Sequence, residues 1–525
     1  MMAGDSLRRG LLANYLGKGF CALLGLISLP VLYRQLGPEA FGLFGLFFSV
    51  QAVLGVFDFG VGAAMQRDLA ALDANSRRIR PADVCATLRS IERLLWVIAI
   101  TVCAVAFSLS TYLAGHWLGV QALPIEVVAS TLGWITIAAA LQLIGSFYMG
   151  CLNGLRLHAQ TNIIQSSVWA TRFVALMICI KAGVAPPASM SLAVLSVLQA
   201  WSAANLLLVV WARMNLTRAL PATANTSGVV HLKRAAQFGL PLVATTTLIM
   251  LFNQVDKIAA SRLITLETLG KYTIVWSVAE VMYLMYQPIY TSFLPVFAGR
   301  FAAAQDAGHS FELSQSVSLA WQMMTVAVFP VAVVIFALSG LVVFAWTGDR
   351  QLAQTSSGVL RWVIVGAGIN AFLFIPFALQ QAAGDMRPWA WRIALSLLLY
   401  APLAIAAISR WGMLGAAAAW CLGSACLALW LARASIQYLG RQGLQLSDGA
   451  GMFTSSLKTL IICSMVVLLV LLFPFPAERY GAAALTLGTL AVCLLLALRS
   501  QPGVWTLFLQ LVHRMQGKHS RSASS

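Results

Sequence analysis

Six of the charged side chains within the long apolar stretches of the sequence stand out, because a charge is costly there. At 1.5 Å of rise per residue, Arg172 lies about eleven residues into its stretch and Glu280 about eleven residues into another, so both reach mid-membrane depth. The other four lie nearer the ends of their stretches: Lys18, Asp58, Asp256 and Lys257. A charge deep in hydrocarbon costs several kcal/mol, so one that persists normally faces a partner or a water-filled cavity. These six residues are our candidates for the lining of such a cavity.

Each of these charges also has an ordinary explanation. Lys18 and Lys257 can extend to a membrane interface. Asp256 and Lys257 can form a simple pair at a helix end. Arg172 and Glu280 lie too deep for their side chains to reach an interface, so the alternative for them is a mutual ion pair between the two lobes. The carboxylates of Glu280 and Asp256 can carry a coupling proton or cation, or can neutralise a neighbouring base.

The composition indicates that the apolar stretches are membrane spans. The 525 residues are 60% hydrophobic and 10% charged, with a mean hydropathy of +0.83, which no water-soluble domain of this length sustains. We predict an all-α, polytopic integral membrane protein with about 14 transmembrane helices. The spans are expected near residues 11–33, 40–64, 94–114, 125–149, 161–181, 190–212, 238–261, 269–297, 318–346, 359–383, 389–409, 413–433, 455–473 and 481–498.

The positive charge of the chain concentrates in alternate loops. The formal net charge is +17, and most Lys and Arg residues fall in short loops on one side, which indicates membrane topology and contact with anionic lipid rather than nucleic acid. This side is predicted to be cytoplasmic, with both termini on it. Arg8 and Arg9 precede an apolar run that lacks a cleavage site, so we expect this run to remain as the first helix.

The spans group into two halves. We predict an N-terminal lobe of six spans (1–212), a polar cytoplasmic linker (213–237), a C-terminal lobe of six spans (238–440), an additional helix pair (441–500) and a basic cytoplasmic tail (501–525). Six spans return the chain to its starting side, so the two lobes are expected to be parallel repeats. Residues 84–95 and 229–234 have an apolar and a basic face, so each can lie in the interface plane or extend the next span.

One segment of the sequence occurs twice. Residues 34–50 align without a gap on residues 262–278 (262 − 34 = 228). The matched pairs include Arg34 and Arg262, Glu39 and Glu267, and Gly42 and Gly270. In both copies an apolar helix ends in a tight turn, a Glu lies in the first turn of the next helix, and a Gly permits close packing. Each lobe is therefore expected to open with a helical hairpin.

Several function classes lack their sequence signatures. No loop exceeds roughly 30 residues, which leaves no room for a folded catalytic domain. The phosphate-binding GxxxxGK[ST] motif and the metal-binding HExxH motif do not occur, and the nine cysteines are scattered singly. We therefore expect neither an enzyme nor a resident cofactor or metal ion.

Two segments resemble a known family. Residues 14–62 are similar to the opening of bacterial Wzx-type flippases for lipid-linked oligosaccharides, which belong to the multidrug, oligosaccharidyl-lipid and polysaccharide exporter superfamily. The similarity is greatest in the LGPEAFG turn (36–42) and in Asp58-x-Gly60. Residues 253–278 resemble the second-half signature of that family, an Asp followed by a short helix end and LGxY.

The resemblance implies a fold and a cargo. The fold would be two lobes around a central cavity that opens alternately to the two membrane faces. The cargo would be an oligosaccharide on undecaprenyl diphosphate, moved from the cytoplasmic to the periplasmic leaflet of the bacterial inner membrane. Membrane lipids and a polysaccharide polymerase or co-polymerase complex would be the partners.

The same resemblance suggests roles for the charged and aromatic residues. Lys18 and Arg172 would attract the diphosphate in an inward-open state, because Arg and Lys bind phosphate strongly in a low-dielectric cavity. Lys257 and Arg262 would lie nearer the exit. Tyr283, Tyr286 and Tyr290 recur at helical spacing beside Glu280 and could stack on sugars, although aromatic stripes in membrane helices more often serve packing.

The sequence is also compatible with two rival functions. One is a related exporter of drugs or small cations, which should prefer an acidic cavity, whereas the charges here are mixed with a basic bias. The other is a membrane enzyme or scaffold of envelope polysaccharide synthesis. Such an enzyme would need catalytic acids on a sizeable external loop, and the sequence has no such loop.

The topology can be tested by cysteine labelling in intact cells. We expect cysteines substituted at Asp73, Thr226 and Ser524 to react only when the reagent reaches the cytoplasm, because basic loops are retained there. Cysteines at Ser189 and Glu478 are expected to react with an impermeant reagent from outside. Labelling of position 226 from outside would contradict both the orientation and the parallel repeat.

Overall fold

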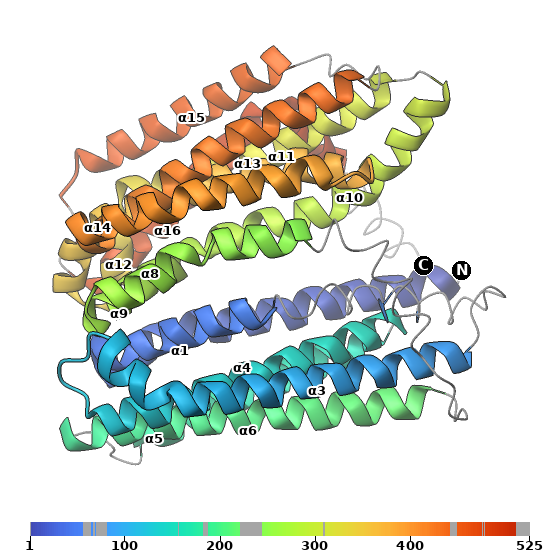
Figure 1. Ribbon diagram of the computed structural model, residues 1–525. Helices are drawn as coiled ribbons and strands as arrows, with labels where there is room; N and C mark the ends of the chain where they lie inside the picture. Colours follow the sequence, from blue (N-terminus) through green and yellow to red (C-terminus); the bar gives the residue numbers. More distant parts are fainter. Residues whose placement is uncertain are drawn as a thin grey trace, which may run out of the picture. The chain divides into compact units, whose positions relative to one another are not determined.

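The structure, a computed structural model, is all helical (Figure 1). It describes the backbone of residues 2–55, 65–66, 69, 81–155, 157–181, 187–220, 244–307, 310–441, 449–474, 476 and 478–510. Within these ranges, β-structure is limited to one isolated parallel bridge, between Gly119 and Thr265. Nine helices of this described part are long and apolar enough to cross a membrane. The prediction of an all-α, multi-pass membrane protein is confirmed.

Two of these long helices each cover two predicted spans. Helix α1 (Met2–Gly55) is interrupted at Gly37, which has a φ of 78°, and α14 (Arg387–Arg441) is interrupted at Gly412, which has a φ of 57°. Positive φ is the conformation that glycine adopts at little cost. Each glycine therefore marks the tight turn that joins two successive spans.

The chain divides into two compact units, and the first comprises Met1–Ile274 and Ile408–Met413. Its helices are α1, α3 (Pro81–Tyr112), α4 (Ile125–Gly154), α5 (His158–Lys181), α6 (Pro187–Ala219), a helix at 244–252, α8 (Val255–Leu263) and most of α9 (Leu266–Ala279). The most extensively buried of these helices is α4, which packs against α1, α3, α5 and α6. Its small residues permit this, because Gly133 lies against Phe107 and Gly145 against Leu208.

The second unit comprises Val275–Ala407 and Leu414–Ser525. Its helices are α10 (Val281–Ala307), α11 (Ser310–Ala337), α12 (Ser339–Thr347), α13 (Arg350–Ala382), most of α14, α15 (Gly449–Leu471) and α16 (Arg479–Ser500). Helix α10 packs on α11 and α13, and α11 also packs on α15 and α16. The lobe and linker boundaries inferred from sequence stay predictions.

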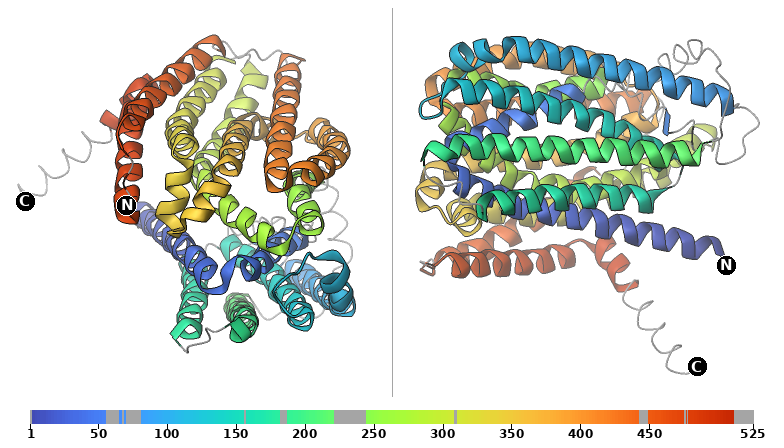
Figure 2. Two further views of the ribbon diagram at one scale, coloured as in Figure 1. Left: turned by 90° about the vertical axis from the view of Figure 1, so that its left-hand side faces the viewer. Right: turned by 90° about the horizontal axis from the view of Figure 1, so that it is seen from below.

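The last two helices are fastened to α11 and α12 at both ends (Figures 1 and 2). At one end the guanidinium of Arg479 donates to the carbonyl oxygens of Ala345 and Trp346, at 2.9 and 2.7 Å, and so caps the C-terminal carbonyls of α12. At the other end, Trp321 on α11 donates to Ser456 on α15 at 2.8 Å. Paired hydrogen bonds within an apolar environment hold α15 and α16 on this unit.

Three predicted spans are less regular than the sequence suggested. The helix of residues 244–252 stops at Asn253 and Gln254 before α8 begins, Glu280 separates α9 from α10, and Leu338 separates α11 from α12. None of these four positions is Pro or Gly, so sequence rules for helix breaks did not reveal them.

The structure also decides one alternative that the sequence left open. Residues 84–95 belong to the continuous helix α3, and Val84, Leu88, Ile91 and Leu95 are buried in the protein. This segment therefore extends the third span and does not lie flat in the membrane interface. Residues 229–234 lie outside the described part of the chain.

Candidate functional site

A buried guanidinium forms the cationic centre of the first unit. Arg172 on α5 is only 7% exposed, and its Nη2 donates to Oε1 of Gln142 on α4 at 2.9 Å and to Oδ1 of Asn205 on α6. Asn205 is fully buried and donates its own Nδ2 to the carbonyl oxygen of Ala138 at 2.8 Å, which fixes its Oδ1 toward the arginine. The charge is thus held by two neutral amides from two different helices.

Two tryptophans flank this guanidinium. The Cζ atom of Arg172 lies 5.3 Å from the ring centroid of Trp169 and 5.1 Å from that of Trp201, within the range of cation–π attraction. Among the described residues, Nε of Arg172 has no hydrogen-bond partner and none of the ion pairs involves this arginine. Amides and rings offset only part of the cost of burying a cation. The centre is therefore suited to an anionic group such as a phosphate.

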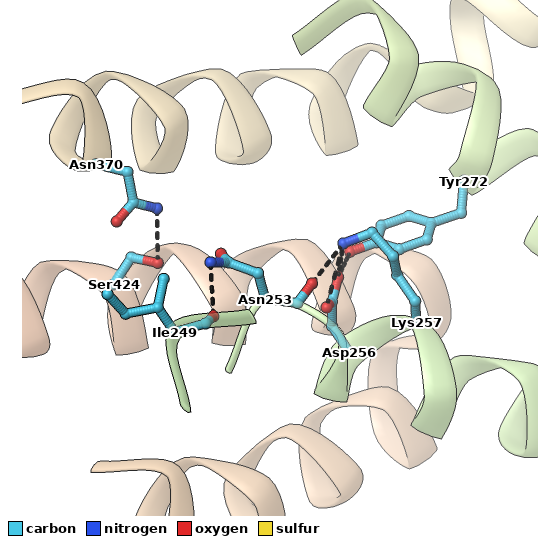
Figure 3. A network of polar contacts seen from close by, with 7 residues as sticks. All are labelled: Ile249, Asn253, Asp256, Lys257, Tyr272, Asn370 and Ser424. Carbon is cyan, nitrogen blue, oxygen red and sulfur yellow. Dashed lines mark hydrogen bonds and ion pairs between the residues drawn. The ribbon is translucent and has the colours of Figure 1, made fainter. Parts of the chain in front are cut away.

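A second centre lies where the seventh predicted span is broken, and it is acidic (Figure 3). Asp256 is fully buried, and its carboxylate accepts a hydrogen bond from the hydroxyl of Tyr272 at 2.6 Å. Nζ of Lys257 lies 3.5 Å from both carboxylate oxygens and donates to the backbone oxygen of Asn253 at 2.8 Å. The predicted pair of Asp256 and Lys257 is present, and it is part of a larger network than the sequence indicated.

The break itself adds polar groups to this centre. The side-chain amide of Asn253 donates a hydrogen bond to the backbone oxygen of Ile249, so this acceptor near the end of the preceding helix is hydrogen-bonded. In the described part of the chain, Oε1 of the buried Gln254 amide has no hydrogen-bond partner. Interrupted membrane helices expose backbone and amide oxygens that suit a proton or a small cation. A carboxylate, an amide oxygen and an unwound backbone therefore occur together at Asn253–Asp256.

The tyrosines of α10 form an aromatic cluster in the second unit. Tyr283 is 48% exposed and lies edge-on to the buried Tyr286 at 5.4 Å between ring centroids. The ring centroids of Tyr286 and Phe374 of α13 lie 4.6 Å apart. The hydroxyl of Tyr290 donates a hydrogen bond to Oε1 of Gln381 at 2.6 Å. Tyr283 therefore has a half-exposed ring, whereas Tyr286 mainly packs.

The two copies of the repeat cross each other reciprocally. A Cβ added at Gly42 would overlap the carbonyl oxygen of Leu266, and one added at Gly270 would overlap the carbonyl oxygen of Pro38. Pro38 and Leu266 are themselves equivalent in the repeat, since 38 + 228 = 266. Equivalent glycines therefore contact equivalent carbonyls, which is the pattern of a local two-fold axis. This crossing of the two repeats, at Gly42 and Gly270, needs glycine at both positions.

Residues 119–122, in the loop between α3 and α4, bind both helices of this crossing and are called the strap below. The carboxylate of Glu39 accepts hydrogen bonds from the backbone N–H groups of Gln121 and Ala122 at 2.7 and 2.9 Å. Leu266 donates its N–H to the oxygen of Gly119 at 2.9 Å. The sequence explained Glu39 by its place in a first helical turn, but in the structure it binds the loop. Its repeat partner Glu267 instead pairs with Lys271 of its own helix.

The other predicted residues are not brought to one place within the described units. Arg34 and Arg262 are both exposed near the repeat turns. Glu280 is exposed between α9 and α10 and belongs to the second unit, whereas Arg172 belongs to the first, so their pairing stays a prediction. Asp58 and the side chain of Lys18 lie outside the described residues. No group of three or more potential metal ligands occurs in the described part of the chain.

Known proteins that are similar to this chain show its family. The model of the polysaccharide biosynthesis protein family matches residues 7–301, more than half of the chain. The chain belongs to this family. It is 23% identical over 416 residues to a Shigella flexneri protein whose name assigns it to O-antigen transport, covering 78% of this chain and 92% of that one.

The fold of this polysaccharide biosynthesis protein also occurs in solved transporters. The lipid II flippase MurJ in an inward closed conformation superposes with a TM-score of 0.68 at 13% identity, covering 93% of this chain and 98% of MurJ. An inward-facing multidrug transporter of the MATE family superposes with a TM-score of 0.65 at 14% identity, covering 81% of this chain and 96% of that one. The matches are transporters and flippases, not enzymes, as the sequence predicted.

Several residues of both centres could not be found from the sequence. Gln142, Asn205 and Trp201 surround Arg172 from other helices and lie 29 or more positions away in the sequence. Gln254 is an uncharged amide inside an apolar span, which carries little signal by itself. Only their common depth in adjacent spans could have linked them, and depth does not say which helices are neighbours.

The crossing of the two repeats can be tested by adding single methyl groups. Gly270→Ala places a Cβ on the carbonyl oxygen of Pro38 and should destabilise the protein by about 1–3 kcal/mol, the usual cost of overpacking. Gly488→Ala on α16 is the matched control, because nothing lies within 4 Å of that Cβ. The measurement is the midpoint of thermal unfolding of the detergent-solubilised protein. Equal midpoints for the two variants would contradict the close crossing.

Proposed function

We propose that this polysaccharide biosynthesis protein moves an undecaprenyl-diphosphate-linked oligosaccharide across the bacterial inner membrane, from the cytoplasmic to the periplasmic leaflet, by alternating access. The family supports a role in polysaccharide synthesis, and the transporter fold supports movement of a molecule rather than its chemical conversion. The observation that carries the proposal to this cargo is the cationic centre at Arg172.

The cationic centre has the chemistry that a diphosphate headgroup requires. The guanidinium of Arg172 is oriented by Gln142 and Asn205 through Nη2, while Nε keeps a donor without a partner among the described residues. A buried arginine without a bound carboxylate gains most from an anion that supplies several oxygens. A diphosphate provides such oxygens, whereas a cationic drug would be repelled. Lys18 would attract the same group nearer the cytoplasmic face.

The sugars require a different surface. Tyr283 presents a half-exposed ring in the second unit, and it packs edge-on against Tyr286, which is itself packed on Phe374. An amphipathic ring of this kind offers an apolar face to a sugar and a hydroxyl at its edge. In this proposal Lys257 and Arg262 contact the headgroup only on the way out.

The acidic centre supplies the driving force in this proposal. In this proposal the movement of the charged headgroup is coupled to a proton or small cation at Asp256, a buried carboxylate at a helix interruption. Binding of a proton or a small cation would neutralise Asp256 and weaken its contact with Lys257. Lys257 would then attract the departing phosphates.

The role of Arg172 can be separated from a structural one by export and protein level together. If Arg172 binds diphosphate, Arg172→Ala should insert normally but fail to support surface polysaccharide, and Arg172→Lys should retain part of the function. If it pairs with Glu280 instead, loss of either partner should lower the protein level, and the exchange of both residues should recover it. Arg410→Ala, an exposed arginine, is the control. Normal export by a stable Arg172→Ala protein would overturn both roles.

The role of Asp256 can be tested with nearly isosteric changes. Asp256→Asn keeps an oxygen for the Tyr272 hydroxyl but removes the charge, so surface polysaccharide should be largely lost while the membrane level of the protein stays near normal. Tyr272→Phe keeps the charge, loses one hydrogen bond and should cost only about 1–3 kcal/mol of stability. Glu126→Gln, at the start of α4, controls for loss of an acidic group. Full export by Asp256→Asn would refute coupling through this carboxylate.

A further inference from the structure

The second half of α1 has two packed faces within two helical turns. Gly42 and Gly45 face α9, where a Cβ at Gly45 would lie 3.2 Å from Cβ of Thr273. Phe44 and Phe47 face the opposite way and are 0% and 1% exposed. The residues that form the crossing of the two repeats and the residues that pack toward α6 thus share one rigid segment of helix.

Trp201 of α6 connects this segment to the cationic centre. Its ring centroid lies 5.3 Å from that of Phe44 and 5.6 Å from that of Phe47, both edge-on. On its other side, Cζ of Arg172 lies 5.1 Å from the same ring. Trp201 is therefore in contact with the charge and with the helix of the crossing.

The position of Trp201 is set by packing. It is 3% exposed, and its Nε1 has no hydrogen-bond partner among the described residues. A ring without a hydrogen-bonded anchor follows its neighbours, and in a close-packed interior a displaced ring displaces what it touches. The attraction between guanidinium and ring weakens when an anion binds the guanidinium, because the cation is then neutralised.

We propose that Trp201 is a positioning residue that couples Arg172 to the crossing of the two repeats. Neutralisation of Arg172 releases the ring, the ring shifts against Phe44 and Phe47, and the second half of α1 tilts at the glycine contact with α9. The inference rests on the proposed function, since it gives the anion at Arg172 a means to loosen the crossing through which cargo would leave. Trp201 itself touches no cargo.

The test measures the crossing directly and needs no cargo. Cysteines at Gly45 and Thr273 would have Cβ atoms close to the about 3.5–4.5 Å that a disulfide bridges. A specific protease site inserted after Thr226 lets a non-reducing gel distinguish cross-linked halves from separated ones. Copper(II) phenanthroline serves as the oxidant, and each single-cysteine variant controls for pairing with the native cysteines. The quantity measured is the rate of cross-linking in membranes.

The coupling is then read from a double-mutant cycle. Arg172→Gln alone is expected to change the cross-linking rate by about 2- to 30-fold, the range that couplings of this kind span. In a Trp201→Leu background the same change should have no effect, and Trp201→Phe, which keeps an aromatic ring, should restore part of it. Phe44→Leu weakens the next link, which Phe47 also provides, and should reduce the effect even if Trp201→Leu fails to fold. Trp389→Leu, a fully buried tryptophan of the second unit, is the matched control.

Two results would overturn the coupling. The first is a cross-linking rate that Arg172→Gln does not change, and the second is an effect of Arg172→Gln that persists in full in the Trp201→Leu and Phe44→Leu backgrounds. Either result leaves the proposed function standing, because that function is tested by surface polysaccharide. Conversely, normal polysaccharide with Arg172→Ala would refute the cargo role while the cross-linking cycle still reports whether Trp201 transmits the change.

Discussion

The contact on which the described arrangement most depends is the crossing of the two repeats. Without a hydrophobic drive between helices in lipid, close approach depends on small residues, and here Gly42 and Gly270 bring each helix onto a backbone carbonyl of the other. The strap held by Glu39 and the bridge between Gly119 and Thr265 close over this point. A crossing that has no room for a Cβ atom at either glycine packs closely when it is formed. Such a contact has no loosely packed intermediate, which suits a two-state contact.

Buried charge is the second constraint, and the two centres meet it differently. Arg172 is held by neutral amides and rings, so within the described part of the chain its charge is oriented but has no ion-pair partner. Asp256 is bonded to Tyr272 and lies beside Lys257, so its charge is largely compensated. Removing one partner of a compensated pair is costly, whereas adding an anion to an uncompensated cation is favourable. The first centre is therefore suited to a ligand of opposite charge, and the second to exchange of the counter-charge that it already has.

The sequence predicted what depends on local length and composition. Apolar stretches of membrane length indicated the spans, and the repeated glycines indicated the hairpins, because both signals lie within a short window. The breaks at Gln254 and Glu280 could not be predicted, since neither position carries the Pro or Gly that marks most kinks. Trp201 and Asn205 were missed as partners of Arg172 for another reason: contacts between helices depend on packing that no local pattern encodes.

The repeat also places both centres beside one crossing. Phe44 and Tyr272 are equivalent positions, since 44 + 228 = 272. Phe44 packs against Trp201, which covers Arg172, while Tyr272 donates its hydroxyl to Asp256. The same position of the crossing helix thus touches the cationic centre in one copy and the acidic centre in the other. If each centre biases the crossing, a ligand at one must change the affinity for a ligand at the other, because coupling free energies are reciprocal. Divergence of a single repeated position would then be enough to link the two ligands.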